Sequence, residues 1–67
     1  MPTGRVVSWD DHRGYGTVRV DHTGADHFFH CTQIADGTRT IDEGTAVEFD
    51  IVPGRLGRWE AANIVKR

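Results

Sequence analysis

The sequence predicts an all-β domain, a small antiparallel barrel of five strands, from three observations. Five short runs rich in β-branched and aromatic residues follow one another at intervals of about ten residues. Turn residues separate the runs, and the 67-residue chain contains 8 glycines. No segment has the apolar spacing of a full helix. Strands this short and this numerous are typical of a turn-rich β fold.

The strands are expected at five ranges: 5–9, 14–20, 27–31, 45–52 and 59–65. The fourth is the clearest, because apolar Val47 and Phe49 alternate with polar side chains, as in a half-buried strand. Gly14 and Gly16 lie in the second range and indicate a strand that coils tightly. The Pro53-Gly54 pair marks a turn before the last strand.

The chain is expected to form a single domain over residues 1–67. Five strands in so short a chain cannot make a two-sheet sandwich with protected edges. A five-stranded, partly open barrel of the oligonucleotide-binding type (OB-fold) is the economical solution. That fold commonly binds its ligand on the face of its middle strands.

Charge and cysteine content exclude several classes of function. The chain has 8 basic and 10 acidic residues and a net charge of −2, which argues against nucleic-acid binding by charge alone. Its one cysteine cannot form an internal disulfide, so a reducing cytoplasm is the expected location. There is no apolar run near 18 residues and no signal-peptide pattern, so no membrane is expected as a partner.

Two neighbouring strands carry the candidate site. Tyr15, Thr17 and Arg19 share one face of the second strand, and Phe28 and His30 share one face of the third. Laid side by side, these strands would expose a platform on which bases can stack. Seven residues are the candidate nucleic-acid contacts: Trp9, Arg13, Tyr15, Thr17, Arg19, Phe28 and His30.

The roles within this set differ. The aromatic side chains and His30 are expected to stack, and Arg13 and Arg19 to lie near phosphates, although scattered arginines can also be solvated charge. Trp9 is expected on the platform, with a bulge that turns it inward as the alternative. Trp59 is expected to pack against the barrel, with a place beside the platform as the alternative.

Neither a metal site nor a catalytic residue is expected. His27 and His30 point to opposite faces of one strand, so they cannot hold one ion without distortion. No base or oxyanion site marks Cys31 as a nucleophile, and we interpret it as a small half-buried residue. His27, near a strand end, is expected to be half-buried and hydrogen-bonded.

The order and spacing of these segments resemble the cold-shock domain family over residues 4–65. Residues 13–18 are similar to its first ribonucleoprotein motif, usually Lys-Gly-Phe-Gly-Phe-Ile, and residues 27–31 to its second, usually Val-Phe-Val-His-Phe. The Glu-Gly approach to the fourth strand and the closing Ala-Ala-Asn-Ile also match. The resemblance implies single-stranded RNA and DNA binding, an RNA chaperone or gene-regulatory role, and a stacking role for His30.

The chain departs from the family pattern at several aromatic positions. Ser8 falls where the family has Trp, Thr17 and Cys31 replace phenylalanines of the two motifs, and Thr38 lies near a usual loop aromatic. Residues 58–60, Arg-Trp-Glu, replace Pro-Gln and make this connection one residue longer. Because stacking contributes about 1–3 kcal/mol per base, we expect weaker binding than in a typical member, or binding over fewer nucleotides.

The expected function is non-catalytic binding of single-stranded RNA or DNA by a monomer, with no cofactor and no small-molecule substrate. The alternative is a barrel of the same type that has weak or lost nucleic-acid binding and serves as a protein-interaction or regulatory module. The missing aromatics and the acidic net charge favour that alternative.

Overall fold

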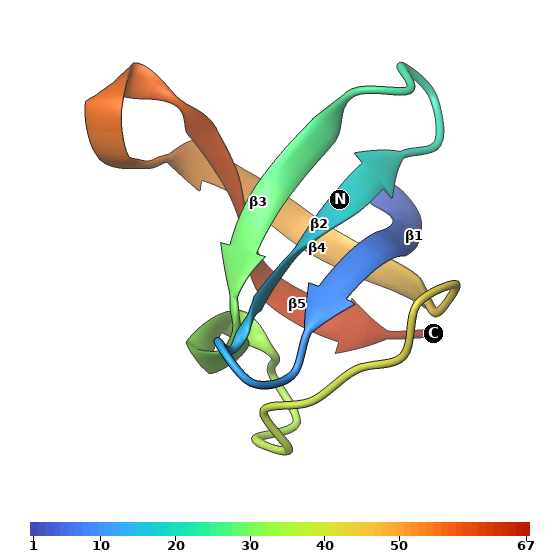
Figure 1. Ribbon diagram of the computed structural model, residues 1–67. Coiled ribbons are helices and arrows are strands. Elements are labelled where there is room, and N and C mark those ends of the chain that lie inside the picture. Colours follow the sequence, from blue (N-terminus) through green and yellow to red (C-terminus); the bar gives the residue numbers. More distant parts are fainter.

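The computed structural model describes residues 1–67 and forms a closed barrel with the strand order β1-β2-β3-β5-β4 (Figure 1). The strands are β1 (Thr3–Asp10), β2 (Tyr15–Val20), β3 (Asp26–His30), β4 (Ala46–Pro53) and β5 (Trp59–Lys66). The predicted all-β barrel of five strands is confirmed. Each strand begins and ends within 2 residues of the range expected from the sequence.

The barrel closes at a narrow seam between β3 and β5. The other four neighbouring pairs are antiparallel, as expected, but β3 and β5 run parallel and share the single register pair Phe28 and Glu60. A second parallel contact, the isolated bridge between Ile34 and Ile64, lies beyond the end of β3. The barrel is therefore closed rather than partly open, and its seam brings the middle of the expected platform next to the start of β5.

The interior is apolar and follows the alternation of the strands. Phe29, Val47 and Phe49 have no exposed surface, and their neighbours along the strands face outward. Ten hydrophobic residues form this core: Val6, Val18, Val20, Phe29, Ile34, Ile41, Val47, Phe49, Ala61 and Ile64. Burial of these side chains provides the main stabilising contribution in a domain of this size.

A β-bulge in β1 changes which side chains face inward. Val6 pairs with Val18 and Ser8 pairs with Thr17, so two steps along β1 correspond to one step along β2. The extra residue is Val7. Beyond it, every side chain of β1 lies on the face opposite to the one that simple alternation predicts.

The connections carry two short 3-10 helices, η1 (Cys31–Gln33) and η2 (Arg55–Gly57). Neither has the length and apolar content of a membrane-spanning helix. In Figure 1 the β4–β5 connection with η2 (orange) projects on one side of the barrel, and the long connection before β4 (yellow-green) lies at another. Buried Ile41 fixes the long connection to the core.

The long connection is also fastened to β5 by a surface ion pair, which predicts a pH dependence. Asp36 accepts hydrogen bonds from the backbone and side chain of Thr38, and Lys66 Nζ lies 3.0 Å from its Oδ2. These contacts, the Thr38 bonds first, lower the pKa of Asp36 from 3.8 to about 2. Because the folded-state pKa is the lower one, the ionised carboxylate stabilises the fold above pH 3.8 and this contribution is lost as the pH falls toward about 2.

We therefore expect Asp36→Asn to lower the urea midpoint near neutral pH, with a difference from the wild type that shrinks as the pH falls through this window. Urea denaturation at a series of pH values measures it. The control is Asp42→Asn, an exposed carboxylate in the same connection, whose difference from the wild type should not follow this course. An Asp36→Asn difference that is constant with pH would contradict the assigned role of this ion pair.

Candidate nucleic-acid interface

The two middle strands present an aromatic pair on their outer face. Cross-strand register places Tyr15 opposite His30 and Thr17 opposite Phe28. The rings of Tyr15 and Phe28 lie 5.3 Å apart between centroids and are tilted by 40°. Phe28 is 39% exposed and His30 is also exposed, whereas Phe29 between them is buried. The expected grouping of Tyr15, Thr17, Phe28 and His30 on one face is present, and their part in binding stays a prediction.

Trp9 does not lie on this face, contrary to our expectation. The bulge at Val7 makes Trp9 the partner of Gly16, on the inward side, and puts Ser8 on the outer face opposite Thr17. The Trp9 ring stacks on Phe29 at 5.6 Å with an interplanar angle of 13°. Its Nε1 donates to Asp11 at 3.2 Å. Trp9 is thus half-buried and packs on the core, because one extra residue reverses the alternation.

The space for the Trp9 ring comes from Gly16. A Cβ at Gly16 would collide with the carbonyl oxygen of Ser8 and lie 3.0 Å from Cε3 of Trp9. The glycine in this strand is therefore explained by close approach of β1 to β2. On the outer face above it, the hydroxyl groups of Ser8 and Thr17 form a hydrogen bond of 2.6 Å.

The two arginines of the candidate set are both held by neighbours. Arg13 Nη1 donates to Tyr15 Oη at 3.2 Å, and this bond, with a smaller effect of Asp10, raises the pKa of Arg13. Arg19 makes two hydrogen bonds to Asp26, from Nε at 2.8 Å and from Nη2 at 3.2 Å. The same pairing raises the pKa of Arg19 and lowers that of Asp26. Arg13 is thus aligned with a platform ring, and the charge of Arg19 is largely balanced.

The two histidines of β3 have different settings. His30 caps η1, because the backbone N–H of Thr32 donates to its Nδ1 at 3.4 Å. His27 is half-buried and donates from Nδ1 to the carbonyl oxygen of Trp59 at 3.1 Å, as expected. That bond links β3 to the first residue of β5. Cys31 is half-buried, also as expected.

The start of β5 and the β4–β5 connection contribute residues that lie outside the seven candidate contacts. Trp59 was expected to pack against the barrel, with a place beside the platform as the alternative; 57% of it is exposed, so the alternative is correct. It lines one cavity together with Phe28 and the neighbouring loop residues Arg55, Leu56 and Arg58. Trp59 stands beside the platform because the seam joins β3 to the start of β5. The pairing across a parallel seam leaves no local signal in the sequence.

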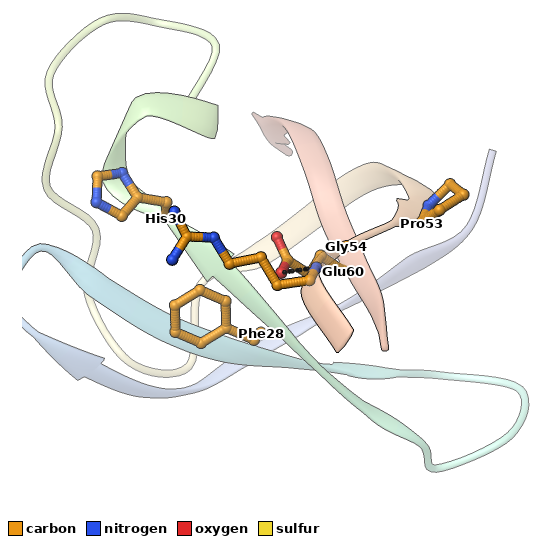
Figure 2. A pocket seen from close by; sticks show the side chains of 6 residues that line it. Phe28, His30, Pro53, Gly54 and Glu60 are labelled. Atoms are coloured by element: carbon orange, nitrogen blue, oxygen red, sulfur yellow. Dashed lines mark hydrogen bonds between the residues drawn. The ribbon is translucent and has the colours of Figure 1, made fainter. Parts of the chain in front are cut away.

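A second cavity of about 690 Å³ adjoins the first (Figure 2). Its walls come from both sides of the seam: Phe28, His30, Pro53, Gly54, Arg55 and Glu60. We call the exposed face of Tyr15, Phe28 and His30, extended by Trp59 and Arg55, the stacking surface. It joins three aromatic rings, an imidazole and one guanidinium group in one continuous region.

Comparison with known proteins identifies the family. The model of the family described as "'Cold-shock' DNA-binding domain" matches residues 2–67. The chain belongs to the cold-shock domain family. Among relatives, it is 42% identical to cold shock protein CspB of Bacillus caldolyticus and 39% identical to CspD of Bacillus subtilis, in both cases over 98% of each chain.

A solved structure supports the same conclusion about the fold. The protein described as drosophila Unr CSD456 superposes with a TM-score of 0.81 and 30% identity, and the match covers 98% of this chain and 26% of that one. This cold-shock domain therefore corresponds to about a quarter of that larger chain. Family membership implies nucleic-acid binding without catalysis, in agreement with the exposed stacking surface.

Proposed function

We propose that this cold-shock domain binds single-stranded RNA or DNA by stacking bases on Tyr15, Phe28 and His30, and that it acts as an RNA chaperone or a regulator of transcription or translation. The observation that carries the proposal is the Tyr15–Phe28 pair, half-buried at Tyr15 and exposed at Phe28, on the outer face of strands whose opposite face forms the core. Aromatic rings on an outer strand face offer flat apolar surfaces on which bases can stack. The proposal includes a monomer in the cytoplasm.

Cationic groups stand at both ends of this surface. Arg13 lies at the Tyr15 end, and Arg55 and Arg58 lie beside Phe28 and Trp59. A strand that crosses the surface from Tyr15 to Trp59 would meet these guanidinium groups with its phosphates. Arg19 contributes less, because Asp26 engages its Nε–Nη2 edge and balances its charge. Thr17, opposite Phe28 in the register, adds a hydroxyl group to the same face.

This arrangement predicts binding of moderate affinity with a weak dependence on salt. With three arginines placed to meet phosphates, the slope of log K against log salt should have a magnitude of about 2 or less. The measurement is a fluorescence titration with heptamers of thymidine and of uridine at two salt concentrations. Trp59 provides the signal, because it is exposed beside Phe28. The expected dissociation constant is micromolar or tighter, short of low-nanomolar at physiological salt.

Two results would contradict these expectations at different levels. Low-nanomolar affinity would contradict the weakening expected from the missing aromatics. Absence of binding at hundreds of micromolar would contradict nucleic-acid binding itself and favour the alternative, a protein-interaction module. Two observations support the protein-interaction module: the net charge of −2 and the loop residue Leu56, which is 96% exposed. Two experiments distinguish these functions. Retention on single-stranded DNA resin supports nucleic-acid binding, and co-elution with components of a cell extract on a sizing column supports protein interaction.

A further inference from the structure

One residue beside the stacking surface is neither aromatic nor cationic. Glu60 is the register partner of Phe28 across the β3–β5 seam, and both side chains line the same two cavities. Figure 2 shows the Glu60 carboxylate and the Phe28 ring on neighbouring strands, with His30 at the far side of the cavity. A base stacked on Phe28 would therefore present an edge to Glu60.

The Glu60 carboxylate is held in place by the preceding turn. Its Oε2 accepts the backbone N–H of Arg55 at 3.4 Å. The side chain covers Gly54, where any Cβ would collide with its carboxylate. The N–H contact is long and uses one oxygen only. The carboxylate is thus oriented by the turn while it keeps lone pairs for a further donor.

The chemistry of a carboxylate distinguishes the bases. An ionised carboxylate only accepts hydrogen bonds. The Watson–Crick edge of guanine offers two adjacent donors, N1–H and the N2 amino group, which match its two oxygens. Uracil and thymine offer a single donor, N3–H, between two carbonyl oxygens that repel the carboxylate. Cytosine and adenine offer one amino group beside an acceptor nitrogen.

We propose that Glu60 makes the position on Phe28 selective for guanine over uracil and thymine in a bound single strand. The proposal rests on the nucleic-acid binding proposed above and assigns base discrimination to a named group at the seam. Arg55, which lines the same cavity, supplies a donor of the kind that suits the O6 atom of guanine. Stacking alone would give little preference among bases.

The test compares three DNA heptamers by fluorescence anisotropy: all thymidine, thymidine with one central guanosine, and thymidine with one central inosine. Inosine keeps N1–H and O6 but lacks the N2 amino group. We expect the guanosine heptamer to bind the wild-type protein about tenfold more tightly than all-thymidine, as for one bidentate base contact. The inosine heptamer should fall between them. Glu60→Gln should reduce the guanosine preference to within about twofold.

The matched control is Glu48→Gln, which removes the same charge from β4, where Glu48 lies near Arg67 and lines neither cavity. It should keep the guanosine preference. Equal binding of all three heptamers by the wild type would overturn the inference and leave the proposed function standing. So would a Glu60→Gln variant that changes the affinity for all three by the same factor. Binding of none of them would overturn both.

Discussion

Replacement of Phe28 by alanine is expected to weaken single-strand binding about tenfold or more while leaving the domain folded. A base stacked on an aromatic ring contributes about 1–3 kcal/mol by alanine substitution, and about 1.4 kcal/mol is tenfold in affinity. Phe28 faces solvent over 39% of its surface and lies outside the core cluster. The free energy of unfolding should therefore change by less than about 1 kcal/mol. Heptamer titration and urea denaturation of the same preparation measure both quantities.

The matched control is Val65→Ala, which truncates another exposed apolar side chain, 41% exposed on β5 and outside both cavities. Its affinity for heptamers should equal that of the wild type. If Phe28→Ala bound as tightly as Val65→Ala, the stacking surface would lose its central member, and bases would have to bind elsewhere.

Replacement of the next residue, Phe29, is expected to have the opposite consequence. The side chain has no exposed surface, sits in the middle of the core cluster and supports the Trp9 ring. Truncation of a buried Phe to Ala costs about 3–5 kcal/mol, and a domain of this size has roughly 3–5 kcal/mol in total. Phe29→Ala should therefore be largely unfolded, which far-UV circular dichroism and urea denaturation will show.

A conservative variant keeps this prediction testable if the alanine variant does not express. Phe29→Leu retains most of the buried volume and should unfold cooperatively, at a lower urea midpoint than the wild type. A Phe29→Ala protein with the wild-type midpoint would contradict the assignment of Phe29 to the core. The contrast between two adjacent phenylalanines tests the alternation in β3 directly, because only the face differs.

The strands were predictable because alternation and turn residues are local properties. The pattern of Val47 and Phe49 against Glu48 and Asp50 needs no knowledge of the rest of the chain. The placement of Tyr15 and Phe28 on one face follows from the same period and from the short β2–β3 connection.

The errors arise where placement depends on contacts between distant segments. Trp9 turns inward because Val7 is an extra residue in β1. The apolar pattern of the strand does not reveal this bulge. Trp59 lies beside Phe28 because β5 returns to β3 to close the barrel, and neither strand encodes that pairing locally. The carboxylate that balances the charge of Arg19 belongs to Asp26, which was expected in a loop and is the first residue of β3. The sequence alone did not predict which side chains become partners across strands that are distant along the chain.

The narrow seam between β3 and β5 has a consequence for how a ligand affects the protein as a whole. These two strands share one register pair and the His27–Trp59 bond, fewer register pairs than any other neighbouring strands, so we expect the barrel to open here first. A nucleotide stacked on Phe28 with its edge hydrogen-bonded to Glu60 would contact both β3 and β5. Binding of the nucleic acid would then slow amide hydrogen exchange in β3 and β5, because the ligand holds the two strands together.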